Sequence, residues 1–409
     1  MGFNKKTVED VEVHGKVVLL RTDYNVPIDA AGRITDAFRV TRSVPTIQYL
    51  LSHGAQKVVI VSHLGRPEGR INSRLSLAPV AAVLKNELPS VNVVFANFLP
   101  GVMGDGSEFL ANMTATPVGS VVMLENLRFN PGEEQNSEEF ARSLVQVTGA
   151  DIFVQDGFAV LHRESATTNA ITRLLPSVAG LLVIREVSAL QQAIYNPVRP
   201  FLSINGGAKI SDKIGVLEKL MEVSEGMLIG GAMANTFLQY SGLNVGASKV
   251  ELGQGATLNA IYAAKTARNV QLLVPKDVAV VREIAPNAKV DIKSVSAVGS
   301  HDIIVDIGPR TAELFTSMIH EANTIFWNGT LGITEYAQFS SGSRAVAEAI
   351  GYKRNGLTII GGGDTAGFVR SLMLSNRNLD YSLISTGGGV TLDFIASKPL
   401  PGLAGLQDR

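Results

Sequence analysis

The sequence contains no cysteine among its 409 residues. Disulfide bonds, thiolate metal sites and a cysteine nucleophile are therefore excluded. An excess of charge of either sign is also missing, because 36 Lys and Arg stand against 37 Asp and Glu. Nucleic-acid-binding proteins usually carry a basic excess. We therefore expect no nucleic-acid partner, and any anion site must be local, built from a few converging side chains.

Long apolar runs are absent as well. The most apolar segment, LLPSVAGLLVI, stops at Arg185 after too few residues to span a bilayer. The N-terminal MGFNKKTVED has no apolar core of the kind found in a secretory signal. We expect a soluble, cytoplasmic protein without a membrane partner.

The chain does contain 45% hydrophobic residues and 40 glycines, and it is long enough for two domains. Short β-rich runs alternate with segments whose apolar residues recur every three or four positions, as in amphipathic helices. This alternation predicts an α/β protein with doubly wound parallel sheets, divided near residues 172–200. The predicted strands lie near 17–22, 58–62, 93–97, 121–124 and 151–155 in the first half, and near 201–205, 227–230, 271–274, 303–306, 324–327, 357–360 and 381–385 in the second.

Basic and polar side chains follow the predicted strands of the first half. A single arginine is best interpreted as a solvated salt-bridge partner, and a lone histidine as a structural hydrogen-bonding group. Several basic residues at successive strand ends favour a ligand site instead, because ligands of α/β proteins bind there and arginine matches phosphate and carboxylate oxygens. We predict a site for a small, multiply anionic molecule from Arg21, Asp23, Asn25, Arg39, His63, Arg66, Arg128, His162 and Arg163.

Glycines follow the predicted strands of the second half, including Gly206-Gly207, Gly230-Gly231, Gly329, Gly361–Gly363 and Gly387–Gly389. Each of these alone also fits an ordinary tight turn. Together they predict a polyphosphate site, since glycine lets the backbone approach a ligand and helix starts bind anions. Neither a Walker A loop nor a Rossmann fingerprint is present. Asp364 is a candidate ligand for Mg²⁺.

An anion site and a polyphosphate site together suggest phosphoryl transfer, which depends on positioning and charge neutralisation. Arg39, Lys209 and Lys213 are candidates for neutralising the transferred group. No general base is evident. A carboxylate acceptor needs none, because it is already ionised at neutral pH, so an acyl-phosphate substrate is favoured.

Seven motifs in order, RTDYNVP, SHLGRP, LENLRF, GGAKISDKI, WNGTLG, GGGDTA and STGGG, resemble phosphoglycerate kinases from end to end. The resemblance implies two Rossmann-like domains flanking a cleft and joined by a helix. It implies reversible, Mg²⁺-dependent transfer between 1,3-bisphosphoglycerate and ADP, giving 3-phosphoglycerate and ATP in glycolysis and gluconeogenesis. A hinge-bending monomer is also implied. The GRITDAFRV segment and the length look most like the archaeal branch.

The resemblance also implies domain limits. A phosphoglycerate-binding domain is expected at 1–175, with residues from about 390 to 409 packing back on it. A hinge helix is expected at 176–200 and a nucleotide-binding domain at 201–389.

Carried over by position, the resemblance implies three sets of site residues. The catalytic set is Arg39, Lys213, Gly363 and Gly388. The phosphoglycerate set is Asp23, Tyr24, Asn25, Arg39, His63, Leu64, Gly65, Arg66, Arg128 and Arg163. The nucleotide set is Gly207, Lys209, Lys213, Gly231, Asn328, Glu335, Gly362, Gly363, Asp364 and Thr365, with Glu335 on the ribose and Asp364 acting through the metal.

Four positions depart from the commoner pattern of that family. Gln155 replaces asparagine, Ser165 a second histidine, Ala232 a glycine and Thr330 a proline. Two alternatives stay open: a non-catalytic nucleotide- or anion-binding protein that has kept the fold, and a different two-domain kinase. Fold alone does not establish activity. A decayed copy, however, would be expected to have lost the charges that the mechanism needs.

Overall fold

A computed structural model describes residues 3–409 of the chain. Its internal contacts divide the chain into two units, each described here by itself. Unit 1 comprises Met1–Ser188 and Pro399–Arg409, and unit 2 comprises Ala189–Lys398. The first boundary falls inside helix α6 (Leu181–Tyr195).

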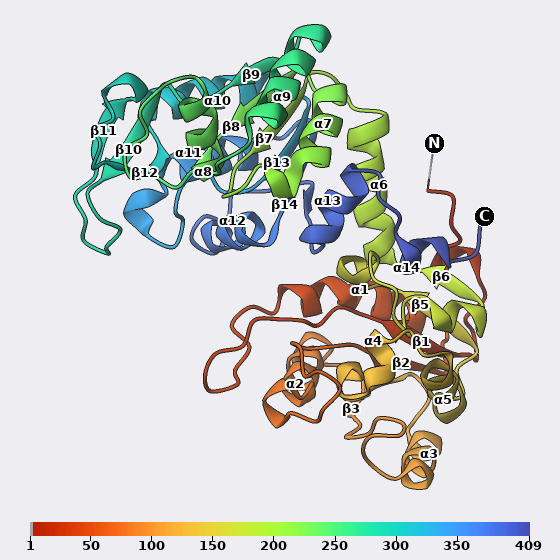
Figure 1. Cartoon of the computed structure of the whole chain (residues 1–409). Coiled ribbons are helices and arrows are strands. Elements are labelled where there is room, and N and C mark those ends of the chain that lie inside the picture. The colour runs from red at the N-terminus through yellow and green to blue at the C-terminus, as the bar shows by residue number, and fades with distance from the viewer. Residues whose placement is uncertain (1–2) are drawn as a thin grey trace. The chain divides into compact units, whose positions relative to one another are not determined.

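Unit 1 is built on a six-stranded, entirely parallel sheet (Figure 1). Its strand order is β3-β4-β2-β1-β5-β6. The strands are β1 (Val17–Arg21), β2 (Lys57–Val61), β3 (Val93–Phe95), β4 (Ser120–Met123), β5 (Ile152–Gln155) and β6 (Ser177–Ala179), of which only β6 was not predicted. The α-helices are α1 (Phe38–Ser52), α2 (Ala78–Glu87), α3 (Gly106–Ala115), α4 (Pro131–Glu134), α5 (Glu138–Thr148) and α14 (Pro401–Ala404), with 3₁₀ turns η1 (Val8–Asp10), η2 (Ser73–Leu75), η3 (Leu127–Phe129), η4 (Phe158–Val160) and η5 (Ala170–Arg173).

Helices cover both faces of this sheet, and the central strands are buried along nearly their whole length, with apolar residues at most positions. Alternate residues of a strand point to opposite faces. In β2, Val58 and Ile60 pack with α1 and α2, whereas Val59 and Val61 pack with α3 and α5. A strand buried on both faces reads as a continuous apolar run, which is why these strands were recognisable in the sequence.

The last residues of the chain complete unit 1. The Lys5 ammonium forms an ion pair with Asp408 at 2.8 Å and donates hydrogen bonds to the carbonyls of Ala404 and Leu406. The backbone N–H of Gln407 donates to the Ser177 carbonyl of β6 at 3.0 Å. The two ends of the chain are therefore joined within one unit.

Unit 2 contains a second six-stranded parallel sheet, in the order β15-β14-β13-β7-β8-β9. Its strands are β7 (Phe201–Asn205), β8 (Gly226–Ile229), β9 (Gln271–Leu273), β13 (Thr324–Asn328), β14 (Leu357–Gly361) and β15 (Leu383–Ile384), all of them predicted. The α-helices are α7 (Ile214–Val223), α8 (Gly231–Tyr240), α9 (Gly255–Arg268), α10 (Pro309–Glu321), α11 (Ser341–Gly351), α12 (Gly363–Ser375) and α13 (Gly389–Ile395), with 3₁₀ turns η6 (Ser211–Lys213), η7 (Val295–Ala297) and η8 (Ala337–Phe339).

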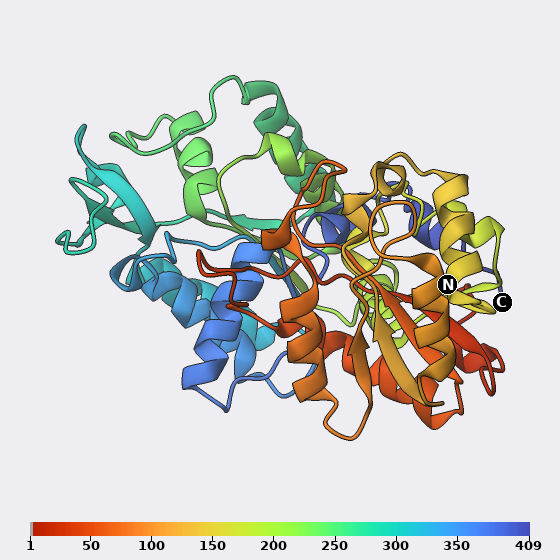
Figure 2. The same ribbon diagram turned by 90° about the horizontal axis from the view of Figure 1, so that it is seen from below.

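A third, antiparallel sheet in unit 2 was not predicted (Figure 2). It pairs β10 (Asp277–Val281) with β11 (Asp291–Ser294) and β12 (Ile303–Ile307). The strand expected near 303–306 therefore belongs to this sheet and not to the parallel one. The connection from β9 to β10, residues 274–276, is far too short for the crossover of a dozen or more residues that parallel neighbours require.

Strand β10 also caps helix α10. The helix begins after Gly308, which has no side chain to accept hydrogen bonds from the first turn. The buried Asp277 carboxylate does so instead: it accepts from the Arg310 N–H at 3.1 Å, the Thr311 N–H at 2.8 Å and the Thr311 hydroxyl at 2.6 Å.

We predict that Asp277→Ala lowers the free energy of unfolding of unit 2 by about 1–3 kcal/mol, because it removes this cap and leaves buried donors unpaired. The measurement is urea unfolding followed by the fluorescence of Trp327, which is the only tryptophan and is fully buried in β13. Asp291→Ala, at an exposed position of β11, is the control. An unchanged midpoint for Asp277→Ala would contradict the capping role.

Candidate active site

In unit 1 the order of the strands changes direction at β1. Strands β2, β4 and β3 lie on one side of it, and strands β5 and β6 lie on the other. Ligands of open α/β sheets bind beyond the carboxyl ends of the strands at such a switch point. The segments that follow β1, β2, β4 and β5 carry Asp23, His63, Arg128 and Arg163, respectively. The predicted anion-binding residues thus follow the central strands of one sheet.

One group of side chains is centred on the buried Asp23. Arg39 in the first turn of α1 donates to its carboxylate at 2.7 Å and to the Asn25 carbonyl at 3.2 Å. His63 Nε2 lies 3.9 Å from the other carboxylate oxygen. This geometry holds the Arg39 guanidinium at the end of β1.

His63 is 2% exposed and is surrounded by cations. Burial, and then the charges of Arg21, Arg128, Arg163 and Arg39, hold the pKa of His63 well below its usual 6.5. The imidazole is therefore neutral at physiological pH, and its contact with the Asp23 carboxylate is not an ion pair. A neutral imidazole surrounded by arginines is suited to donate a hydrogen bond to an anion.

The turn after β2 connects several predicted residues through Gly65, which has a φ of +62°. The Gly65 N–H donates to Asn25 Oδ1 at 2.9 Å, and the Gly65 carbonyl accepts from Arg128 at 2.5 Å. Arg66, the next residue, is exposed to solvent. The turn thus orients Asn25 and Arg128 and leaves Arg66 on the surface.

The side chains of two predicted residues point into the core. Tyr24 is fully buried, with its hydroxyl 2.7 Å from the Ser43 hydroxyl, and Leu64 belongs to the same apolar cluster. These side chains therefore face away from solvent. Any contact of Tyr24 or Leu64 with a ligand would have to go through the backbone.

A cavity of about 410 Å³ lies beside this group, lined by Arg21, Arg128, Glu133, Arg163 and Ser165 among others. Arg21 joins the two: its guanidinium lies 3.3 Å from His63 Nδ1 and also lines the cavity. Arg21 was among the strand-end residues predicted to bind an anion, although the set of site residues carried over from the resemblance omits it. An arginine that ends an otherwise apolar strand, VVLLR, was the available signal.

Glu133 in α4 is the buried counter-charge of this cavity, and the sequence analysis missed it. Its carboxylate lies 3.8 Å from Arg21 and accepts hydrogen bonds from the Ser165 hydroxyl at 2.9 Å and the Thr167 hydroxyl at 2.7 Å. Thr167 in turn accepts from Arg21 at 2.8 Å. Ser165, which departs from the family pattern, is thus part of the network that fixes Arg21.

The departure at Gln155 lies at the end of β5. The Gln155 side-chain oxygen accepts a hydrogen bond from the Gly157 N–H at 3.0 Å, which shapes the turn leading to His162 and Arg163.

In unit 2 the switch point lies between β7 and β13, whose last residues, Asn205 and Asn328, face each other in register. The turns that follow are in direct contact. The Gly207 N–H donates to the Thr330 carbonyl at 3.0 Å. A Cβ atom on Gly206 would lie 2.2 Å from that carbonyl, and one on Gly329 would lie 2.3 Å from the Gly206 backbone. These glycines are needed because backbone packs against backbone.

Two further departures lie in or beside this contact. Thr330 contributes its backbone carbonyl, which a proline would supply equally, so the change at this position keeps the contact. Ala232 follows Gly231 in the first turn of α8 and lines the pocket described below.

Other predicted glycines leave open space. A Cβ atom on Gly363 or Gly388 would have nothing within 4 Å. Both lie at the start of a helix, α12 or α13, where unpaired N–H groups attract anions. Thr365 in α12 is buried, and its hydroxyl accepts from the Gly329 N–H at 2.8 Å. The start of α12 is therefore tied to the turn after β13.

Lys213 is the last residue of the 3₁₀ turn η6, which follows the Gly206-Gly207 turn. Its ammonium donates a hydrogen bond back to the Gly206 carbonyl at 2.8 Å. Burial lowers the pKa of Lys213 to about 8, opposed by the carboxylates of Asp212 and Asp364. The side chain is therefore mostly protonated at pH 7. Lys209, one turn earlier, is exposed.

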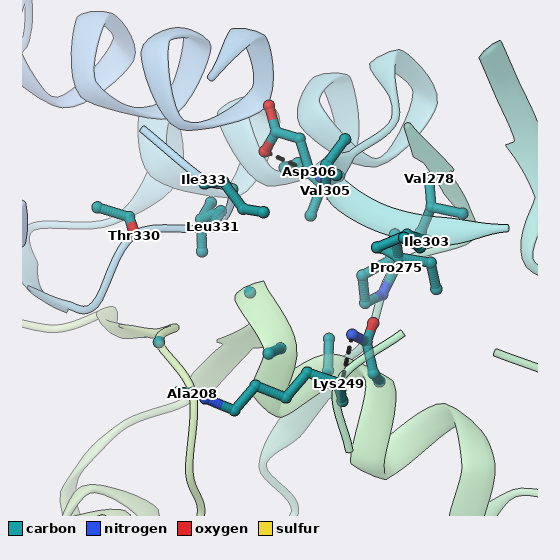
Figure 3. Close-up of a pocket in the computed structure, with 18 of the residues that line it drawn as sticks. Ala208, Lys249, Pro275, Val278, Ile303, Val305, Asp306, Thr330, Leu331 and Ile333 are labelled. Carbon is teal, nitrogen blue, oxygen red and sulfur yellow. Dashed lines mark hydrogen bonds between the residues drawn. The ribbon is translucent and has the colours of Figure 1, made fainter. Parts of the chain in front are cut away.

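A pocket of about 530 Å³ in unit 2 contains much of the predicted nucleotide set, including Gly207, Gly231, Glu335 and Asp364 (Figure 3). Asn328 and Gly362, two further residues of the set, do not line the pocket. Asn328 is buried, and a Cβ atom on Gly362 would lie 2.6 Å from its side-chain oxygen. Apolar residues of β10 and β12, such as Val278 and Val305, form one wall. Such a wall suits the face of a nucleotide base.

A metal ion could not be held here by protein groups alone. Within residues 3–409 no cluster of three or more His, Asp or Glu side chains has metal-binding geometry. Asp364 is a single, exposed carboxylate in the first turn of α12. This fits Mg²⁺, which is commonly bound by one or two carboxylates together with water and substrate phosphates.

No helix in the described part of the chain is long and apolar enough to cross a membrane.

Comparison with known proteins gives a consistent result. The family model described as "Phosphoglycerate kinase" matches residues 8–398. Phosphoglycerate kinases of Chloroflexus aggregans and Dictyoglomus turgidum are 42% and 43% identical to the chain, each over 408 residues that cover 99% of this chain and 100% of the relative.

Solved structures agree with this. The phosphoglycerate kinase of Coxiella burnetii matches with a TM-score of 0.83 at 36% identity, and that of Pyrococcus horikoshii with 0.80 at 28% identity. Each match covers 98% of both chains.

We predict that the His63 imidazole stays neutral as the pH falls from about 8 to about 6, so that its NMR signal shows no titration in this range. The unfolded chain takes up this proton near pH 6.5 and the folded chain does not, so His63 makes the protein less stable as the pH falls below 6.5. The signal is assigned by its loss in His63→Asn, with His301→Asn as a matched control at an exposed site. A midpoint near 6.5 for His63 would show the cationic environment to be wrong.

Proposed function

The chain belongs to the phosphoglycerate kinase family, and from this premise we propose which of its residues carry out the reaction. The family transfers a phosphoryl group reversibly between 1,3-bisphosphoglycerate and ADP, giving 3-phosphoglycerate and ATP in glycolysis. The protein is accordingly a phosphotransferase with a carboxyl group as acceptor.

The phosphoglycerate site is proposed at the carboxyl ends of the unit 1 strands. The observation that carries this proposal is the contact group of Arg39, Asp23 and His63, joined by Arg21 to a cavity lined by Arg128 and Arg163. Arginines surrounding a neutral histidine suit a ligand with both a phosphate and a carboxylate. The full proposed set is Asp23, Asn25, Arg39, His63, Gly65, Arg66, Arg128 and Arg163, with Tyr24 and Leu64 contributing backbone only.

The nucleotide site is proposed in the pocket of unit 2 and the turns beside it. Glu335 would contact the ribose, and Lys209, Lys213, Gly363 and Gly388 the phosphates. Asp364 would hold Mg²⁺ together with nucleotide phosphates, and the ion would supply neutralising charge there when bound. The remaining proposed residues are Gly207, Gly231, Asn328, Gly362 and Thr365.

The proposed chemistry needs no general base in the protein. In the direction of ATP formation, the bond between phosphorus and the carboxyl oxygen of the acyl phosphate breaks, and a bond forms to a terminal oxygen of ADP. The leaving carboxylate departs without a proton, because it is ionised at neutral pH. Arg39 and Lys213 would neutralise charge on the transferred group, with backbone N–H groups at Gly363 and Gly388.

The finer points on partners and location are proposals too. We infer a monomer that works on small-molecule substrates in the cytoplasm, as expected for a glycolytic enzyme. The alternative of a non-catalytic binding protein is not favoured, because relatives of this chain at about 40% identity over the full length are phosphoglycerate kinases. A different two-domain kinase would be recognised by turnover with another acceptor.

We predict that Arg39→Ala lowers kcat by about 10²- to 10³-fold, because the variant lacks the guanidinium that would neutralise charge on the transferred phosphoryl group. The measurement is steady-state turnover of ATP and 3-phosphoglycerate with Mg²⁺. Glyceraldehyde-3-phosphate dehydrogenase consumes the product and reports it through loss of NADH. Arg33→Ala, an exposed arginine paired with Asp29, is the matched control and should keep full activity.

A folded wild-type protein without turnover would overturn the proposed function. A fully active Arg39→Ala variant would leave the function intact and remove Arg39 from the catalytic set.

We predict that Glu133→Gln raises KM for 3-phosphoglycerate by about tenfold with a smaller change in kcat, since Arg21 and the Ser165–Thr168 turn lose a charged acceptor. Glu133 acts here as a positioning residue, so Glu133→Asp should restore part of the affinity. Glu138→Gln, at an exposed ion pair with Arg142, is the control. A lower melting temperature with unchanged KM would mean that Glu133 only stabilises the fold.

A further inference from the structure

The pocket of unit 2 has an unusual balance of charge for a site that takes a polyphosphate. Its ionisable lining side chains are Asp306, Glu335, Asp364 and Lys249, so that Lys249 supplies the only positive charge among the described lining residues. The predicted lysines, Lys209 and Lys213, are not part of this lining. A multiply negative ligand requires nearby positive charge.

Lys249 is presented by a segment that is fixed to two elements of unit 2. Its carbonyl accepts a hydrogen bond from the buried Asn235 side chain of α8 at 3.1 Å. The preceding Ser248 accepts, through its hydroxyl, from the Ile304 N–H of β12 at 2.8 Å. The backbone at Lys249 is therefore held by α8 and β12, and the residue is exposed to solvent.

The Lys249 side chain extends along the pocket toward Ala208 (Figure 3). Ala208 directly follows the Gly206-Gly207 turn, which is part of the proposed phosphate site. No ion pair of Lys249 is found among residues 3–409. A lysine on an open surface usually points into solvent, whereas this one is directed along a ligand pocket at the turn that would hold phosphates.

We propose that Lys249 binds the phosphate chain of the nucleotide and makes the pocket discriminate a nucleoside diphosphate from an uncharged nucleoside. This inference rests on the proposed function and adds a specificity-determining residue to it. Lys213 donates to a backbone carbonyl at the far end of the same turn. The two ammonium groups would therefore approach the phosphates from the pocket and from the turn, respectively.

The test is calorimetric titration of the full chain with MgADP and, separately, with adenosine. Lys249→Met keeps an unbranched side chain, one heavy atom shorter than lysine, and removes its charge. We expect Kd for MgADP to rise roughly five- to tenfold with no change for adenosine, and Lys249→Arg to restore most of the affinity. Lys289→Met, an exposed lysine outside the pocket, is the control and should leave both constants unchanged.

A second readout is salt dependence. The MgADP affinity of the wild type should fall more steeply with salt than that of Lys249→Met, because one charge contact is missing in the variant.

Two results would overturn the proposal: an unchanged MgADP affinity in Lys249→Met, or an equal loss for MgADP and adenosine, which would mean that Lys249 shapes the base pocket. Both leave the proposed function standing if the wild type turns over ATP and 3-phosphoglycerate. A wild type that binds neither ligand and shows no turnover would overturn the proposed function together with this proposal.

Discussion

Direct contact between the turns after β7 and β13 is the constraint on which the nucleotide side of the molecule depends. Gly206 and Gly329 touch through their backbones, and neither has room for a Cβ atom. Thr365 then ties the start of α12 to the same place through the Gly329 N–H. The start of α12 and the Lys213 ammonium, which donates to the Gly206 carbonyl, are thereby held around one point. The positions of these phosphate-binding groups follow from how closely the two backbones approach.

In unit 1 the side chains of the proposed anion site are held in place by charge, and not by close backbone contact. The strand ends of this unit are fixed by ion pairs: Glu133 faces Arg21 in a fully buried pair, and the buried Asp23 faces the half-buried Arg39. Breaking a buried pair leaves an uncompensated charge, which is costly, so such groups fix one another strongly. A site for a compact anion needs an excess of cations, and the paired carboxylates keep those cations in place before the ligand arrives.

The sequence predicted what depends on local pattern. Strands buried on both faces were visible as apolar runs, and the residues after them were recognisable as site residues because strand ends converge. Contacts between distant segments were not visible. Glu133 and Ser165 are 32 positions apart, and nothing in either segment indicates their bond. The antiparallel β10–β12 sheet was missed because a helix-length spacing suggested another parallel strand. Lys249 lies in a segment without a motif, so only its place in the pocket reveals it.

The return of the last residues to unit 1 has a consequence for the order in which the protein is made. Residues 399–409 leave the ribosome after the whole of unit 2, yet Gln407 pairs with β6 and Asp408 with Lys5. During synthesis, unit 1 must therefore wait with part of its β6 edge unpaired, at the Ser177 carbonyl, while some two hundred further residues are translated. In topological terms unit 2 is an insertion in unit 1, and unit 1 reaches its full set of internal contacts only after residues 399–409 have been made.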